Sequence, residues 1–189
     1  MKLLTTGVVA LAIFLSCISP GRNELPARSF KKQFLERIND ARHKGCNCGD
    51  EYMPPAPPLT WNDELEAAAL AHAEDMSSKN YFSHTSKDGR TMSDRAINAG
   101  YTYKGYKSFA VGENIAEGQM SINEVMDGWL KSPGHCKNLM SPSFKEVGVA
   151  QFNKYWVQDF GGREPFSKAE QKLIKSGRYK LIEKTSSKH

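Results

Sequence analysis

The stretch Ser132-Pro133-Gly134-His135-Cys136-Lys137-Asn138 places an imidazole and a thiol side by side, directly after a proline–glycine break. Two earlier stretches, Phe82-Ser83-His84 and Gly112-Glu113-Asn114-Ile115-Ala116, add a second histidine and a carboxylate. All three titratable side chains fall at a turn or at the end of a predicted element, where side chains can point into a surface cleft. We therefore expect His84, Glu113 and His135 to lie together in one solvent-accessible cleft.

Seven motifs, taken in chain order, resemble those of the CAP superfamily (cysteine-rich secretory proteins, antigen 5 and pathogenesis-related 1), whose domain is also called SCP-like. Besides the three stretches above, they are Ile38-Asn39-Asp40-Ala41-Arg42, Pro58-Leu59-Thr60-Trp61-Asn62, Ala71-His72 with Asp75-Met76, and Tyr155-Trp156-Val157-Gln158-Asp159-Phe160-Gly161. The resemblance runs from about residue 30 to residue 161 and is to the bacterial lipoprotein type. It implies an α+β fold, a three-layer α-β-α sandwich with a central antiparallel sheet.

The resemblance also implies a set of site residues. In the CAP family a cleft holds two histidines and two acidic residues, which in some members bind zinc or another divalent ion. His84, Glu113 and His135 match three of these positions, but the fourth falls on Ser132. The three could form an open metal site, or a polar network in which Glu113 accepts hydrogen bonds from the imidazoles. We favour the network, or a weakly bound divalent metal such as zinc, over catalysis, and expect no required cofactor.

Motifs that would indicate an enzyme are absent from the sequence. It has no Gly-x-Ser-x-Gly elbow, no His-Glu-x-x-His, no phosphate-binding glycine loop and no dinucleotide fingerprint. His72 falls on the apolar stripe of a predicted helix, which favours a core histidine over a ligand. The three tryptophans are interpreted as core anchors, and the neutral domain argues against nucleic-acid binding. The tryptophans are Trp61, Trp129 and Trp156. We expect a monomer.

The N-terminus has the pattern of an export signal. Lys2 precedes an apolar run over residues 3–15, which is shorter than the roughly 20 residues that span a bilayer. The run ends at Leu15-Ser16-Cys17, which resembles a bacterial lipobox and predicts lipidation of Cys17 with palmitate or a related fatty acid. The alternative is ordinary cleavage after a small residue, with Cys17 incidental.

The net positive charge of the chain is concentrated at its C-terminal end. Residues 168–189 contain seven lysine and arginine residues against two glutamates, which accounts for the whole net charge of +5. Such a tail is most often a solvated segment, although it could contact anionic lipid. The predicted organisation is a lipoprotein signal peptide (residues 1–16), a tether (17–28), a CAP domain (29–163) and a basic C-terminal extension (164–189).

Three cysteines remain after the signal, and in an exported chain disulfides can persist. The resemblance implies a Cys48–Cys136 bond, because a cysteine before a glycine pairs with the Gly-His-Cys motif in bacterial members; Cys46–Cys136 is the second choice. A Cys46–Cys48 bond would be strained. His43, Cys46 and Cys48 lack the usual spacing of zinc ligands.

Hydrophobic periodicity and capping patterns predict the elements between these motifs. Apolar spacing predicts a helix over residues 30–41 that stops before Gly45, followed by a rigid proline-rich connector over residues 46–58. Capping patterns predict further helix starts, and apolar alternation predicts strands. The helices begin at Thr60, Thr91, Ser121 and Ser167, and the strands cover residues 111–116, 147–152 and 155–160, the last two joined by a tight Asn153-Lys154 hairpin.

Three functions are compatible with these features. We favour a membrane-anchored, extracytoplasmic binding module for a small lipid, a sterol or a protein partner, on a cell surface or a periplasmic face. The second is a metal-dependent hydrolase, such as a peptidase, in which His84 and His135 hold zinc and Glu113 is a ligand or general base. The third is a structural or adhesive surface protein.

Overall fold

The computed structural model describes residues 27–179. The predicted signal peptide, the predicted lipidation site Cys17 and the last ten residues of the basic extension lie outside the described residues. Within residues 27–179, no helix combines the length and the apolar character needed to cross a membrane.

The centre of the fold is a four-stranded sheet with the strand order β3-β5-β6-β4. Its strands are β3 (Thr60–Trp61), β4 (Tyr106–Glu117), β5 (Glu146–Phe152) and β6 (Tyr155–Pro165). The predicted hairpin between β5 and β6 is confirmed, with Asn153 in the left-handed region at a φ of 52°. The short strand β3 runs parallel to β5, so the sheet is mixed, and the prediction of an antiparallel sheet was wrong at this edge.

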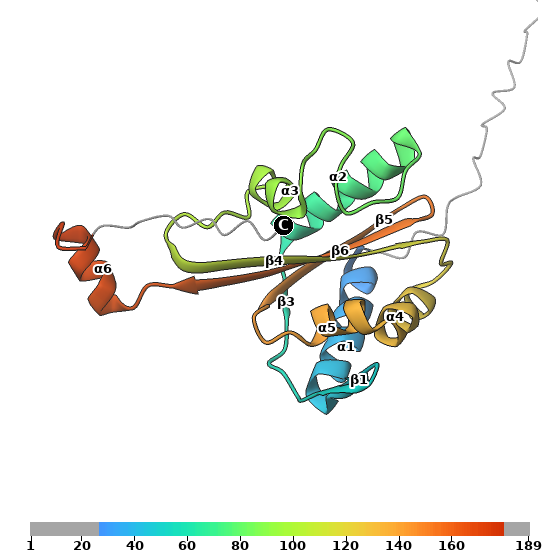
Figure 1. The fold of residues 1–189 in the computed structure, drawn as a ribbon, viewed down its shortest axis with the longest axis horizontal. Helices are drawn as coiled ribbons and strands as arrows, with labels where there is room; N and C mark the ends of the chain where they lie inside the picture. Colours follow the sequence, from blue (N-terminus) through green and yellow to red (C-terminus); the bar gives the residue numbers. More distant parts are fainter. Residues whose placement is uncertain (1–26, 180–189) are drawn as a thin grey trace, which may run out of the picture.

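Helices cover both faces of the sheet, which confirms the three-layer α+β fold (Figure 1). On one face lie α2 (Asp63–Lys79) and α3 (Met92–Asn98). On the other lie α1 (Ala27–Lys44), α4 (Ile122–Lys131) and α5 (Pro133–Met140). Helix α6 (Lys168–Lys175) stands apart from the sandwich at the end of the long β4–β6 ribbon (Figure 1). Gly148 lets β5 touch the start of α2, since a Cβ there would lie 2.0 Å from the Glu66 amide.

Each helical layer packs its own apolar cluster against the sheet. The larger cluster joins α1, α4 and α5 to the strands, and each large side chain in it contributes about 1.5–3 kcal/mol when fully buried. Its buried members include Phe34, Ile38, Trp129, Leu139, Val147, Trp156 and Phe160. Trp61 is half-buried against this cluster. The tryptophans are thus core residues, as predicted.

Local signals at helix ends agree with the structure in most places. Thr91 and Asp94 form a complete capping box, and Ser121 accepts a hydrogen bond from the Glu124 amide. The second helix is different, because Thr60 and Trp61 pair with β5 and are therefore strand residues. Its N-cap is Asn62, whose side chain accepts from the Leu65 amide.

The predicted connector contains a second, two-stranded sheet. Strands β1 (Cys46–Cys48) and β2 (Glu51–Met53) form an antiparallel hairpin that turns at Gly49, where φ is 67°. This hairpin packs on α5, which was not predicted, because Pro133-Gly134 was interpreted as a stop. Pro133 instead occupies the first turn of α5, where proline is favoured because its missing N–H would have no helical partner.

Candidate functional site

Three different elements carry the three predicted site residues. His84 lies in the loop after α2, Glu113 lies on β4, and His135 lies in the first turn of α5. The amide of Asn138, one turn further along α5, donates to the backbone oxygen of Glu113 at 3.2 Å and to Oδ1 of Asn114 at 2.9 Å. These bonds hold the second turn of α5 against the middle of β4.

The carboxylate of Glu113 is the centre of the site. Its Oε1 atom lies 2.7 Å from Nδ1 of His84. Its Oε2 atom accepts a hydrogen bond from the guanidinium of Arg95 at 2.5 Å. Glu113 is only 3% exposed, whereas half of the His84 side chain faces solvent. The pair predicted from sequence is therefore present, together with a buried cation that was not predicted.

Arg95 is held in place by the loop that carries His84. Its Nη1 atom donates to Oγ of Ser86 at 3.1 Å and to the backbone oxygen of Arg90 at 3.2 Å. Arg95 is 3% exposed, so its charge is balanced inside the protein by Glu113.

His72 lies beside this pair and is fully buried. Its Nε2 atom lies 2.9 Å from the backbone oxygen of Ser83 and 3.9 Å from Oε2 of Glu113. Because a carbonyl only accepts, His72 donates to Ser83. Burial lowers the pKa of His72, with a smaller opposing effect from Glu113, so the ring is neutral and bonded. The prediction that His72 is a core histidine is confirmed, but only one ring nitrogen is satisfied, because Nδ1 is buried and has no hydrogen-bond partner among residues 27–179.

A second carboxyl group lies next to that of Glu113, on the neighbouring strand of the sheet. Asp159 on β6 is the register partner of Glu113 on β4 and is 3% exposed. Neither carboxyl oxygen of Asp159 has a hydrogen-bond partner among residues 27–179. Burial raises the pKa of Asp159 well above its ordinary range, and the negative charge of Glu113 raises it further.

Glu113 keeps its charge in the same environment. Burial alone would raise its pKa, but the hydrogen bond from His84 and the charge of Arg95 outweigh burial and lower it. Burial and the mutual charge of the two adjacent carboxyls thus shift their pKa values in opposite directions, that of Glu113 downwards and that of Asp159 upwards.

His135 stands further from the carboxylate. It is half-buried, and its pKa is lowered by burial and then by the charge of His84, so the two imidazoles sense each other. The ligand atoms of His84, Glu113 and His135 do not all lie within 4.8 Å of one another; in the part of the chain that the structure describes, only Cys46, Cys48 and Cys136 form such a group. With both Glu113 oxygens already hydrogen-bonded, the trio in this arrangement does not fit a three-ligand metal site.

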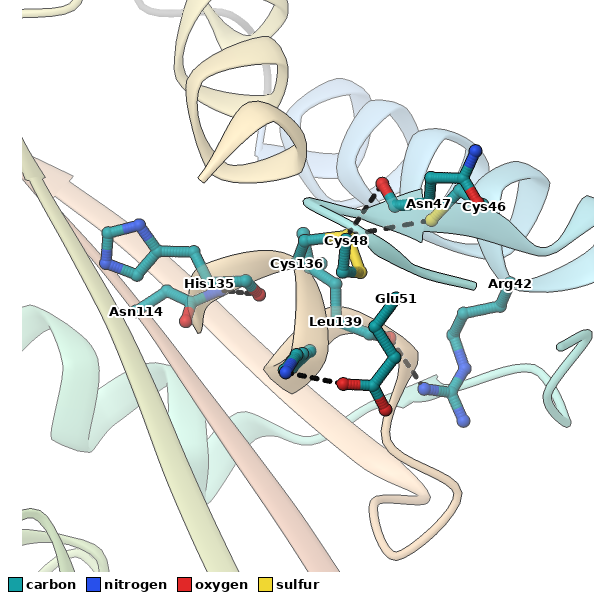
Figure 2. Close-up of a disulfide and its surroundings, with 10 residues drawn as sticks. Arg42, Cys46, Asn47, Cys48, Glu51, Asn114, His135, Cys136 and Leu139 are labelled. Carbon is teal, nitrogen blue, oxygen red and sulfur yellow. Dashed lines mark hydrogen bonds and ion pairs between the residues drawn. A yellow bond between two sulfur atoms is a disulfide. The ribbon is translucent and has the colours of Figure 1, made fainter. Parts of the chain in front are cut away.

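The disulfide prediction is confirmed. Cys48 on β1 and Cys136 on α5 are bonded, with their Cα atoms 5.4 Å apart, and Cys46 is a free thiol (Figure 2). Figure 2 also shows that the His135 ring and the Cys136 sulfur leave α5 in different directions. Oxidised sulfur is neither a nucleophile nor a thiolate ligand, so Cys136 and His135 do not form a catalytic dyad.

Comparison with known proteins agrees with this architecture. The model of the CAP, or cysteine-rich secretory protein, family matches residues 35–160. The chain belongs to the CAP family. It is 33% identical over 137 residues to the uncharacterised protein YkwD of Bacillus subtilis, a match that covers 71% of this chain and 48% of YkwD. It is 36% identical over 103 residues to the uncharacterised membrane protein YlbC of the same organism, covering 54% of this chain and 28% of YlbC.

Two solved structures share the fold. An extracellular SCP-domain protein from Bacillus anthracis superposes with a TM-score of 0.57 at 30% identity, covering 70% of this chain and 40% of that one. An outer surface protein of Borrelia burgdorferi superposes with a TM-score of 0.58 at 23% identity, covering 73% of this chain and 95% of that one. This chain spans less than half of the length of these longer Bacillus relatives: 48% of YkwD, 28% of YlbC and 40% of the Bacillus anthracis protein.

Two residues of this CAP site were missed from the sequence. Arg95 follows the capping residue Asp94 and has the pattern of an exposed helical residue, so nothing marked it as the partner of Glu113. Asp159 did carry a signal, because an acidic residue within the apolar run of a predicted strand is a buried polar group that needs an explanation.

Two of the grooves on the surface of residues 27–179 lie away from Glu113. One, of about 370 Å³, lies between α1, β1 and α4 and includes Cys46, Lys44 and Lys131. The other, of about 500 Å³, lies where the connector meets β4–β6. Its lining comprises Pro57, Pro58, Thr60, Tyr106, Pro142, Phe144, Lys145, Glu146 and Arg163.

Proposed function

We propose that this CAP chain is a non-enzymatic binding module that is exported, held at a bacterial membrane by lipid on Cys17, and takes a small lipid as its ligand. The observation that carries the non-enzymatic part is the state of Glu113. A general base needs an oxygen within hydrogen-bond reach of the substrate, but the Glu113 side chain is 0% exposed and lies between His84 and Arg95, to which its oxygens are bonded. Asp159 is 3% exposed, so it does not reach a substrate in solvent either.

The groove beside Arg163 supports a small lipid as the ligand. Its volume of about 500 Å³ falls within the range of small-molecule sites. Prolines and Phe144 supply apolar lining, and Lys145 supplies an ammonium group that pairs with no acidic side chain of residues 27–179. The guanidinium of Arg163 is already engaged, since it stacks 4.0 Å from the Tyr101 ring centroid and pairs with Glu146. An apolar groove with one available cation suits an amphiphile that has an anionic head.

The cellular location rests on the N-terminal sequence and on the relatives. The apolar run that ends at Ser16-Cys17 is typical of a lipoprotein signal. The Bacillus anthracis relative is described as extracellular and YlbC as a membrane protein. These observations favour an extracytoplasmic domain tethered close to a membrane, where lipids are within reach.

Lipid extraction from the full chain, purified from its native membrane, tests this function. We expect mass spectrometry to find an anionic amphiphile that remains with the wild type and is depleted in Lys145→Glu. The matched control is Lys32→Glu on the exposed side of α1, which should retain it. Absence of any co-purifying lipid from the wild type would overturn the proposal that the ligand is a small lipid. Peptide or ester hydrolysis that disappears in Glu113→Gln would replace the binding module with the hydrolase.

A further inference from the structure

Three sulfur atoms meet between the β1–β2 hairpin and α5. Sγ of the free Cys46 lies 3.6 Å from Sγ of Cys136, which is bonded to Cys48. All three sulfurs lie within 4.8 Å of one another. A thiol is therefore in contact with a disulfide, at the sulfur of Cys136 (Figure 2).

The local fold makes this contact. Cys46 and Cys48 are two residues apart on β1, so their side chains leave the strand on the same side. That side faces α5, where Cys136 projects from the first turns of the helix. Met140, Met53 and Ala41 surround the sulfurs with apolar groups. The hairpin thus presents two alternative partners to a single cysteine.

The three cysteines differ in access. Cys136 and Cys48 are buried, whereas Cys46 is half-buried and lines the groove of about 370 Å³ between α1 and α4. The groove also includes Lys44 of α1 and both Asp127 and Lys131 of α4. A reagent in solvent can therefore approach Cys46 but not the buried disulfide.

We propose that Cys46, Cys48 and Cys136 form a thiol–disulfide exchange centre, through which a small thiol in the groove reaches the buried bond. Rotation of the Cys46 side chain first brings its sulfur in line with the Cys48–Cys136 bond. The thiolate of Cys46 then attacks Sγ of Cys136, a Cys46–Cys136 bond forms, and the Cys48–Cys136 bond breaks. Cys48 leaves as a thiolate and takes up the proton that Cys46 lost. One disulfide replaces another, so this step needs neither an oxidant nor a reductant.

The second step makes Cys46 a modification site. In the exchanged isomer the disulfide reaches the groove, so the thiolate of a small thiol attacks Sγ of Cys46. A mixed disulfide forms on Cys46, and Cys136 leaves as a thiolate that takes up the proton of the small thiol. Two lysines at the groove suit a thiol that also carries carboxylates.

The exchange should quicken as pH rises. The thiolate is the nucleophile, and burial raises the pKa of the Cys46 thiol, so little thiolate exists at neutral pH. The charged groups on the elements packed around it are Lys44, Asp127 and Lys131, with the Glu51–Lys137 ion pair between β2 and α5. Ionisation of Cys46 therefore sets the pH dependence.

Alkylation followed by non-reducing peptide mapping of the full chain tests the proposal. At neutral pH we expect the label on Cys46. After incubation at alkaline pH and acid quenching, we expect it on both Cys46 and Cys48, with Cys46–Cys136 peptides present. Cys48→Ser should form Cys46–Cys136, whereas the matched control Cys46→Ser should show Cys48–Cys136 alone at every pH.

Reduced glutathione provides the second readout. It should form a mixed disulfide with Cys46 in the wild type, and Cys46→Ser should lose its disulfide to glutathione more slowly, by on the order of tenfold. The wild-type mapping requires no variant to fold. A label that stays on Cys46 alone at every pH would overturn the exchange. Equal rates of reduction in wild type and Cys46→Ser would overturn the role of Cys46 as the entry point.

Discussion

Arg95 and Glu113 form a buried ion pair in which one guanidinium nitrogen donates to Oε2 at 2.5 Å, with the two side chains 3% and 0% exposed. The pair joins α3 to β4, and His84 completes it from the surface by contacting Oε1. Because both charged groups have left water, each depends on the other. The candidate site is therefore also a structural element of the fold.

Glu113→Gln should destabilise the protein by about 3–5 kcal/mol, because it leaves the Arg95 charge buried without a counter-charge. Urea denaturation at neutral pH measures the loss. The control is His84→Ala, which removes the half-exposed partner and should cost about 1 kcal/mol. If both variants were equally stable, the buried pair would not be what holds α3 on the sheet.

The same pair predicts a loss of stability in acid. The folded-state pKa of Glu113 is lowered, so its contribution is present above the unfolded pKa of 4.5 and is lost as pH falls through the folded value. The lowered pKa of His72 acts in the same direction below pH 6.5, since the unfolded state takes up the proton first.

Asp159→Asn should leave stability at neutral pH within about 1 kcal/mol of wild type or raise it, because an amide resembles the protonated carboxyl. The folded-state pKa of Asp159 is raised, so its contribution is present below the unfolded pKa of 3.8 and is lost as pH rises through the folded value. Denaturation curves from acid to alkaline pH should show that the variant lacks this decline. A large loss of stability at neutral pH would instead show that Asp159 is ionised in the fold.

Sequence reasoning found those parts of the fold that depend on neighbours along the chain. The spacing of Phe34 and Ile38 predicted a helix and its buried face, and Thr91 with Asp94 predicted a cap. The Asn153-Lys154 turn also depends only on local backbone preference. The family motifs added the pairing of Cys48 with Cys136, which no local pattern contains.

The missed features depend on contacts between distant segments. Arg95 is buried only because the loop at Ser86 and strand β4 close over it. Thr60 is a strand residue only because β5, some 85 positions later, runs beside it. The capping pattern at Thr60 was a sound local signal that tertiary pairing overrode.

Arg42→Lys should destabilise the protein by about 3 kcal/mol, because one ammonium cannot replace a guanidinium that spans several carbonyls. Arg42 is fully buried and donates to the backbone oxygens of Pro57, Leu139 and Ser141 at 2.7–3.0 Å. It thereby joins α1 to the connector and to the end of α5. Thermal denaturation measures the effect, with Arg178→Lys, at an exposed position after α6, as the control. Equal melting temperatures for the two variants would contradict this role.

Cys17→Ala should abolish fatty-acid labelling and release the protein from the membrane fraction, because acyl chains supply the anchor. Metabolic labelling with palmitate followed by fractionation measures both effects. Cys46→Ala is the matched control and should keep label and location, since it removes a different cysteine. Label that persists in Cys17→Ala would exclude the lipobox interpretation.

Zinc should bind the wild type only weakly. A cation at His84, Glu113 and His135 would have to displace hydrogen bonds that Glu113 already makes, and it would lie near the positive charge of Arg95. Ser132 also stands at the position where the family resemblance implied a second acidic residue. Melting temperatures with zinc, and again after chelation, should therefore differ little. Arg95→Gln removes the competing cation, so zinc should stabilise this variant more than the wild type, and adding His84→Ala or His135→Ala should cancel the gain. Strong stabilisation of the wild type that either histidine substitution removes would show that the three side chains close around a metal after all.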